Sequence, residues 1–568
     1  MENRIGVRLA SIGDMPSELV LKNGLVVNVC TDEILNCDVA VSEGKIVGLG
    51  LGYHGKREID CTGKYIMPGF IDAHMHIEST LTAPLELAKI IVLQGTTTCI
   101  SDPHELVNVR GASALRWLLA AVENTPVNFE VMIPSSVPAT EFDTNGAGRF
   151  TADDMREFVD EKNVLGLGEV MCFNDVFAHK REILDKIELF NGKPIDGHAP
   201  NISEQETQLY ALSGIMTDHE CSTFEEAQMK LRAGLFVLIR EESGAQNLEA
   251  IVRGMVENKV PLDRCAFCSD DKHLEDILTL GHIRLNINKA IGLGVSPIEA
   301  IKAATINAAR IYGLSDRGEL SAGKRADIVV CDSITHISPS LVIKDGNIVT
   351  DEYLSGFHPV SCPAELLDTV KFESFDADRI AIKTHSRNHV IGAVKNQLLT
   401  EHLYEAVPGK NGFFVPDSEY SKLCVVERHG RTHNVSAAPL KGYGISNGAV
   451  ATSISHDSHN LIVVGDNDPD IILAAEHVKK LHGGCAVVSG GKIIADIPLE
   501  IAGLISTADA RLLREQIQSV MTAAKSLGVS EGIDPIINLS FMALPVIPSL
   551  RLLDTGLFDA DKFEMIEE

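Results

Sequence analysis

The stretch Pro68-Gly69-Phe70-Ile71-Asp72-Ala73-His74-Met75-His76 decides how the rest of the chain is interpreted. It begins with apolar residues typical of a buried strand and ends in two histidines separated by one residue. In an extended chain, residues i and i+2 point to the same side, so His74 and His76 can bind one divalent ion. Such a pair is more often incidental when it stands alone, so its meaning depends on the residues further along the chain.

Downstream of this stretch, short apolar runs alternate with helical patterns. Eight strand-then-helix units over about 250 residues is the number that builds a (β/α)8 barrel. We therefore predict an α/β fold, with a TIM-like barrel over residues 67–315. The predicted strands are 66–71, 97–100, 129–133, 164–167, 194–196, 215–216, 235–239 and 266–267.

The sequences on either side of the barrel share a pattern of short apolar runs separated by turn residues. Residues 19–27 form two apolar runs broken by Asn-Gly, a strong hairpin signal, and residues 341–349 repeat the pattern with Asp-Gly. We predict one small β-sandwich domain built from both flanks, residues 1–66 and 316–364. Residues 365–568 carry further helical and strand patterns and are predicted to form a separate C-terminal α/β or α+β domain.

Polar residues follow the predicted barrel strands at the point where each strand ends. Glu169, His198, His219 and Asp270 close strands 4, 5, 6 and 8. Because the carboxyl ends of barrel strands meet on one face, these side chains should lie together. The sequence therefore predicts a metal site with the ligands His74, His76, Glu169, His198, His219 and Asp270.

The donor set indicates the number and kind of metal ions. Six ligands are too many for one tetrahedral ion, and two ions bridged by one carboxylate fit better. Imidazole and carboxylate donors without a thiolate suit Mn²⁺, Fe²⁺ or Zn²⁺, among which we predict Mn²⁺.

The charge of the chain excludes one class of partner. The 568 residues include 50 basic and 79 acidic ones, for a net charge of −29. Neutralising phosphates needs Lys and Arg, so we expect neither a nucleic acid polymer nor a membrane as partner. No apolar run approaches the ~20 residues that span a bilayer. We see no secretory signal and expect a cytoplasmic protein.

The strand-end residues resemble the amidohydrolase superfamily, and residues 68–76 look like its opening motif. Many members place a carboxylated lysine where Glu169 stands, so the resemblance assigns the metal bridge to Glu169. Within the superfamily the chain is most similar to the bacterial and archaeal adenine deaminases. The segments that carry this closer resemblance are His74–Ser79, Ser101–Glu105, Gly168–Met171, Cys268–Asp271 and Phe541–Pro548.

The resemblance implies hydrolysis of adenine to hypoxanthine and ammonia on two divalent ions, in purine salvage. It implies that Asp270 takes the proton of the attacking hydroxide and passes it to the leaving amino group. It further implies a homo-oligomer, a dimer or larger, whose residues 365–568 form the C-terminal domain of this family. Asp271 and His104 are candidates for contacts with the substrate.

One departure from related deaminases concerns the acid that protonates the ring. Several of them carry a Glu three residues after the strand-5 histidine, whereas here Asn201 follows His198 at that distance. Glu105 or Asp102, on the loop after strand 2, are the candidates to replace it as catalytic residues, or to hold an additional metal.

Two other functions remain open on the sequence alone. Another amidohydrolase acting on a cyclic amide or a different nucleobase is disfavoured by Glu169 in place of lysine. A catalytically inactive scaffold is disfavoured by the retention of six ligands. A loop of the C-terminal domain could close the site with its histidines, although we expect them to be surface and core residues: His429, His433, His456 and His459.

Overall fold

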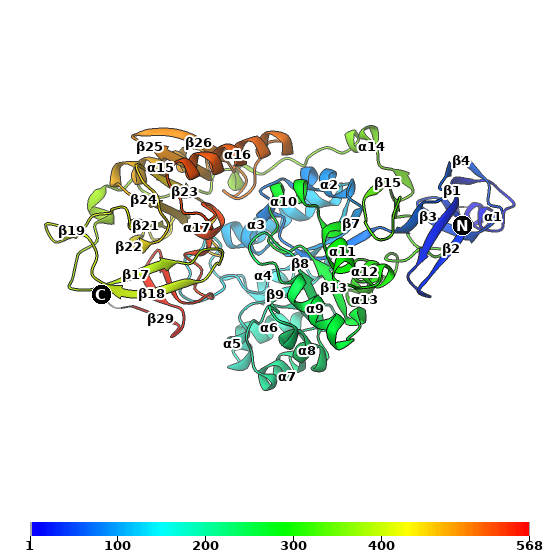
Figure 1. The fold of residues 1–568 in the computed structure, drawn as a ribbon, viewed down its shortest axis with the longest axis horizontal. Helices are drawn as coiled ribbons and strands as arrows, with labels where there is room; N and C mark the ends of the chain where they lie inside the picture. Colours follow the sequence, from blue (N-terminus) through cyan, green and yellow to red (C-terminus); the bar gives the residue numbers. More distant parts are fainter. Residues whose placement is uncertain (1–2, 567–568) are drawn as a thin grey trace.

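The protein, described here from a computed structural model over residues 3–566, consists of three bodies in a row (Figure 1). A β-rich body at the N-terminus lies at one end, an α/β body in the middle, and the C-terminal domain at the other end. The N- and C-termini therefore lie at opposite ends of the molecule.

Each predicted barrel strand has a counterpart in the middle body, and neighbouring strands pair in parallel, but the sixth lies at Thr217–Asp218, directly after the predicted residues 215–216. The first strand begins later than predicted, at Phe70, because Gly69 separates it from a strand that belongs to the N-terminal body. The strands are β6 Phe70–Met75, β7 Thr96–Ser101, β8 Asn128–Ile133, β9 Val164–Val170, β10 Ile195–Gly197, β11 Thr217–Asp218, β12 Phe236–Arg240 and β13 Cys265–Cys268.

These strands form a curled parallel sheet in two hydrogen-bonded pieces, β6 to β10 and β11 to β13. Between the pieces, the Met216 N–H donates to the Ile195 carbonyl at 2.9 Å. The first and last strands approach each other through a parallel bridge between Met75 and Asp270. The curl therefore brings the carboxyl ends of β6 and β13, far apart in sequence, to the same place.

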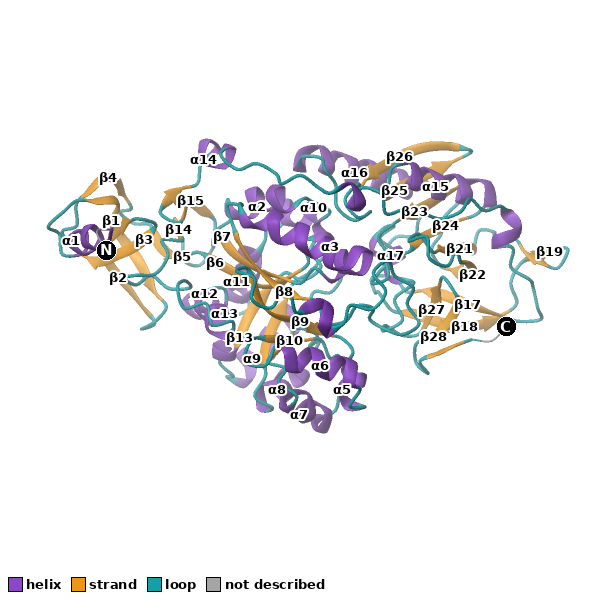
Figure 2. Cartoon of the chain, turned by 180° about the vertical axis from the view of Figure 1, so that it is seen from behind, coloured by secondary structure: helices purple, strands orange, loops and turns teal. Residues whose placement is uncertain are grey.

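Helices cover the outer face of this sheet (Figure 2). At least one helix follows each strand, as the strand-then-helix pattern predicts. They are α2 Pro84–Val92, α3 His104–Glu123, α4 Ala152–Met155, α5 Phe173–Phe177, α6 Arg181–Leu189, α7 Glu204–Leu212, α8 Phe224–Arg232, α9 Leu248–Asn258, α10 Leu274–Thr279, α11 Ile283–Gly292, α12 Pro297–Ala303 and α13 Ile306–Ile311.

The N-terminal body is assembled from both flanks of the middle body, as predicted. It is one continuous eight-stranded sheet, where we expected a sandwich of two. A register shift between Leu21 and Gly24 lets the long strand β1 pair with β4 along its first half and β5 along its second. The elements are α1 Asn3–Ser11, β1 Ser17–Asn28, β2 Glu33–Ser42, β3 Lys45–Gly50, β4 Gly55–Asp60, β5 Tyr65–Pro68, β14 Ile328–Cys331, β15 Pro339–Lys344 and β16 Asn347–Ile348, followed by α14 Asp351–Ser355.

The C-terminal domain is built on a second eight-stranded sheet. In this sheet β17 and β22 pair in parallel and the other neighbouring strands are antiparallel, which is the α+β arrangement of the two we expected. Helix α15 packs on β23 and β25, and α16 packs on β26. The elements are β17 Asn388–Ala393, β18 Thr400–Glu405, β19 Gly409–Lys410, β20 Phe413–Phe414, β21 Tyr420–Val426, β22 Val435–Lys441, β23 Gly448–Thr452, β24 Leu461–Gly465, α15 Asp468–Lys480, β25 Gly484–Ser489, β26 Lys492–Pro498, α16 Ala510–Ser526, α17 Ile537–Phe541, β27 Leu550–Leu553, β28 Gly556–Asp559 and β29 Glu564–Met565.

Among residues 3–566, no helix is both long enough and apolar enough to cross a membrane.

Candidate metal centre

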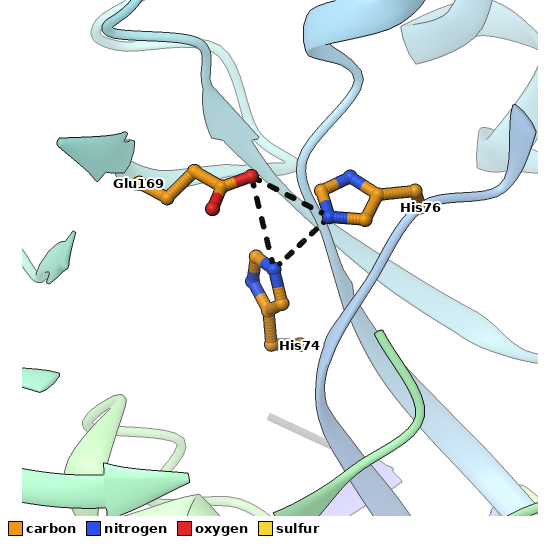
Figure 3. A group of neighbouring side chains, drawn as sticks. All are labelled: His74, His76 and Glu169. Atoms are coloured by element: carbon orange, nitrogen blue, oxygen red, sulfur yellow. Dashed lines mark hydrogen bonds and ion pairs between the residues drawn. The ribbon is translucent and has the colours of Figure 1, made fainter. Parts of the chain in front are cut away.

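The six predicted ligands meet at the carboxyl end of the curled sheet. Figure 3 shows three of them, with the two imidazoles and the Glu169 carboxylate turned toward one another. The Nε2 atoms of His74 and His76 are 3.2 Å apart, and Glu169 Oε1 lies 3.4 Å from His76 Nε2 and 4.0 Å from His74 Nε2. Asp270 Oδ1 approaches the same two nitrogens, at 3.5 Å from His74 and 3.1 Å from His76.

The second carboxylate oxygen of Glu169 faces the other two histidines. Its Oε2 lies 2.7 Å from His198 Nδ1 and 3.1 Å from His219 Nε2. Glu169 therefore contacts both groups of donors, one through each oxygen. A carboxylate in this position could bridge two ions, the role that the resemblance implies for Glu169.

A hydrogen bond selects the nitrogen with which His76 faces the site. Its Nδ1 lies 2.8 Å from the carbonyl of Asp102, which can only accept, so Nδ1 carries the proton. The Nε2 lone pair is then free to bind a metal, because an outer hydrogen bond of this kind fixes the tautomer and orientation of a ligand.

The electrostatics keep both carboxylates ionised. Burial alone would raise the pKa of Glu169, but His198, His104 and His219 hold that pKa well below its usual range. The pKa of Asp270 is likewise held well below its usual range, chiefly by His219 and against the effect of burial.

The histidines differ from one another in protonation. Burial and the neighbouring His219 lower the pKa of His74 to about 4, so this imidazole is neutral. For His219, burial is outweighed by Asp270 and Glu169, which raise the pKa to about 9. In the protein without metal, the protonated His219 imidazole therefore supplies part of the positive charge that the two ionised carboxylates attract.

These residues fit a pair of divalent ions. Around a tetrahedral ion with metal–nitrogen bonds of about 2.0–2.1 Å, ligand nitrogens lie about 3.3–3.4 Å apart. The 3.2 Å between His74 and His76 is close to that spacing. Within each of two triads the donor atoms lie within 4.8 Å of one another, and the triads share Glu169: His74, His76 and Glu169; and Glu169, His198 and His219.

The structure places Asp102 and Glu105 differently. Asp102 Oδ2 accepts the backbone N–H of Glu169 at 2.8 Å, so this carboxylate holds the bridging residue in place. Glu105 Oε1 accepts from the Ser79 hydroxyl at 3.3 Å, and the residue is 1% exposed. Glu105 lines a cavity beside the metal ligands, whereas Asp102 lines neither that cavity nor the one at the ligands.

The two predicted substrate contacts, His104 and Asp271, both line the cavity at the metal ligands. His104 Nδ1 lies 3.3 Å from Glu169 Oε1, and its Nε2 lies 3.7 Å from Asp457 of the C-terminal domain. Asp271 accepts a short hydrogen bond from Ser79. The geometry is compatible with a contact from either side chain to a bound molecule.

Arg240, at the end of β12, is a site residue that the sequence interpretation missed. Its Nη1 contacts Asp270 Oδ2 at 3.0 Å, while both terminal nitrogens contact the Glu220 carboxylate. Its Nε donates to Asn247 at 2.8 Å. The strand-end rule that found the ligands would have found Arg240, because it closes strand 7, which, like strand 3, was left without a candidate.

The C-terminal domain supplies the remaining wall of the cavity. His456 is 7% exposed and, like Asp457, lines the cavity, so a loop of this domain does close the site. His429 and His459 are buried outside the cavity at the ligands, and His433 is exposed, as expected for core and surface residues. The other residues that this domain contributes to the wall are Leu398, Phe541, Leu544, Val546 and Ile547.

Comparison with known proteins agrees with this geometry. The amidohydrolase family matches residues 65–356, which include all six ligands, and the adenine deaminase C-terminal domain matches residues 397–564. The chain belongs to the amidohydrolase family. Curated relatives that match nearly the whole chain place it more narrowly, in the adenine deaminase family.

Two of these relatives are bacterial. The adenine deaminase of Desulfitobacterium hafniense is 44% identical over 551 residues, which cover 97% of this chain and 96% of the relative. Adenine deaminase 2 of Carboxydothermus hydrogenoformans is 40% identical over 561 residues, 98% of each chain. A crystal structure of an adenine deaminase matches 59% of this chain and 100% of its own, at 17% identity and a TM-score of 0.46.

Proposed function

We propose that this protein hydrolyses adenine to hypoxanthine and ammonia, a purine salvage reaction. The observation that carries the proposal is the ligand set bridged by Glu169, in a chain similar over its full length to proteins named adenine deaminase. A free base is uncharged, so an enzyme of net charge −29 needs no basic groove to bind it.

Two divalent ions complete the site, and we propose Mn²⁺. His74, His76 and Asp270 would hold one ion, His198 and His219 the other, and Glu169 would bridge them. Bound ions of this kind lower the pKa of water so that it is a nucleophile at neutral pH.

Asp270 is the proposed base. Its Oδ1 faces the ligand nitrogens of His74 and His76, and its Oδ2 is held by Arg240. An ionised carboxylate in this position accepts the proton of the attacking water and returns it to the amino group that leaves from C6. Arg240 keeps the carboxylate turned toward the reacting atoms.

Glu105 is the proposed acid that protonates the purine ring. Burial, together with the nearby Glu78 carboxylate, holds the pKa of Glu105 well above its usual range, so the carboxyl group keeps a proton at neutral pH. A protonated carboxyl group in an apolar site is a general acid. Asp102 is less suited, because its carboxylate accepts the Glu169 N–H.

The closure of the barrel is also a proposal. We propose that the two parallel pieces close into one (β/α)8 barrel, joined by the Met75–Asp270 bridge and the Met216–Ile195 hydrogen bond. From the resemblance to its family, we also propose a cytoplasmic homo-oligomer, a dimer or larger.

An assay of ammonia release tests the activity. Protein reconstituted with Mn²⁺ or Fe²⁺ is incubated with adenine, adenosine, guanine or cytosine, and with a hydantoin as a cyclic amide. We expect release from adenine above all others. No release from adenine by metal-loaded protein would contradict the proposal, and preferred hydrolysis of the hydantoin would favour a different amidohydrolase.

A pH profile tests the acid. If protonated Glu105 is required, kcat/KM for adenine falls as the pH rises through the raised pKa of this group. Glu105→Gln cannot donate a titrating proton, so its profile should lose that alkaline limb and its rate at neutral pH should fall by about 10²–10⁴-fold. An unchanged alkaline limb would assign the acid elsewhere.

A further inference from the structure

The cavity at the metal ligands adjoins a second cavity, and both are lined by residues of the middle body and of the C-terminal domain. We call the first the metal lobe and the second the far lobe. Both are lined by Glu242, Asp271, Leu398, His456 and Phe541, so the two are neighbours across a shared boundary. Three of these five residues, Leu398, His456 and Phe541, belong to the C-terminal domain.

The far lobe is much smaller than the metal lobe. Its open volume is about 20 Å³, against about 130 Å³ for the metal lobe. A volume of that size holds about one water molecule, so the far lobe has no room for a sugar.

The far lobe also carries buried polar atoms that have no hydrogen-bond partner among residues 3–566. Glu78 Oε1 accepts the Leu106 N–H, but Glu78 Oε2 is one of these unpartnered atoms. Both ring nitrogens of His459, a fully buried side chain, are likewise unpartnered within the described part of the chain. Because buried polar groups in proteins are nearly always satisfied, these atoms indicate a place for water or for polar atoms of a ligand.

The chemistry of these groups matches one edge of a purine. A purine whose C6 faces the metal lobe presents N3 and N9 in the opposite direction, while N7 lies on the same side as C6. The N3/N9 edge has one acceptor, N3, and one N–H donor, at N9. Glu78 offers an acceptor and His459 a donor, so the lobe complements the unsubstituted edge.

On the basis of the proposed function, we propose that the far lobe faces the N3/N9 edge of the base, and that Leu398, Ile537 and Phe541 of the C-terminal domain exclude purines substituted at N9. The active residues of the barrel would thus carry out the reaction, while the C-terminal domain restricts the substrate to the free base. Loss of an N–H that a buried acceptor needs adds to the steric exclusion, since unmade hydrogen bonds are costly in a buried site.

The experiment compares the binding of purine with that of 9-methylpurine. Both compounds lack the 6-amino group, so neither is deaminated during the measurement. Calorimetry with the metal-loaded protein should show 9-methylpurine binding at least 30-fold more weakly than purine. In Leu398→Ala/Ile537→Ala, both half-buried positions, the difference should narrow to less than tenfold. Leu398→Ala alone should narrow it in part and serves if the double variant does not fold.

Ile547→Ala is the matched control, because Ile547 is also half-buried and lines the metal lobe but not the far lobe. It should leave the ratio of the two affinities unchanged. Equal affinities in the unmodified protein, a ratio unmoved by the wall variants, or the same narrowing in Ile547→Ala would each overturn the proposal.

Turnover separates this proposal from the proposed function. The unmodified protein should deaminate adenine and not 9-methyladenine, and the wall variants should gain activity toward 9-methyladenine. Turnover of both compounds by the unmodified protein would contradict the exclusion of N9-substituted purines and would leave the proposed adenine deamination unaffected. No turnover of adenine would overturn both.

Discussion

Two eight-stranded sheets flank the middle body, and they serve it in different ways. The N-terminal sheet, made from residues 17–68 and 328–348, contributes no residue to the cavity at the metal ligands. The C-terminal domain contributes His456, Asp457 and Phe541 among others. Of two domains built on eight-stranded sheets, one thus contributes no side chain to the cavity at the ligands and the other forms part of its wall.

The middle body supplies the six proposed metal ligands, so their removal should have the largest effect on activity. His198→Ala/His219→Ala removes two of the three donors to one proposed ion, so metal content should fall from two ions per chain to at most one. We expect adenine turnover to fall by at least about 10⁴-fold, since the hydroxide no longer forms near neutral pH. Metal analysis after dialysis checks this, and an unchanged count would contradict the two-ion site.

A change in the N-terminal sheet should affect stability alone. The Lys344 ammonium is buried and contacts Asp327 at 3.0 Å. Lys344→Met leaves that carboxylate buried without its partner, which costs about 3 kcal/mol in comparable buried pairs. Denaturant unfolding should show this loss, while kcat per folded molecule stays the same. A drop in kcat would show that this sheet also shapes the site.

Arg240 tests how far positioning around the ligands matters. Arg240→Gln frees the Asp270 carboxylate and removes the arginine partner of Glu220, so kcat should fall by about 10²-fold, or about 2.7 kcal/mol. Arg240→Lys, which keeps the charge, should recover part of the loss. Metal content should remain at two ions per chain, and loss of an ion would instead make Arg240 a determinant of metal binding.

The smallest effect is expected at the edge of the contact between the two domains. Arg514 of the C-terminal domain pairs with Glu275 of the middle body at 2.7 Å, and both side chains are about one-third exposed or more. Arg514→Ala should cost less than about 1 kcal/mol of stability, because exposed ion pairs contribute little. Adenine turnover should stay within twofold. A larger effect would mean that this one pair holds the wall in place.

Much of the middle body could be predicted because its information is local. Alternating apolar runs predict the strands, and polar residues directly after Ile195–Gly197 or Thr217–Asp218 must lie on one face of a parallel sheet. The part of the cavity wall that the C-terminal domain contributes could not be predicted in this way. His456 lies between β23 and β24 with no periodic pattern around it, and it reaches the site only through the packing of one domain on another.

The composite N-terminal sheet also has a consequence for synthesis of the chain. Strand β5, Tyr65–Pro68, pairs with β14, Ile328–Cys331, which leaves the ribosome roughly 260 residues later. At about 5–20 residues per second, that interval is on the order of 15–50 s. During it β5 is an unpaired edge of apolar residues, the kind of surface that invites aggregation. A chaperone that binds nascent chains would find its target at Tyr65–Pro68, well before the active site exists.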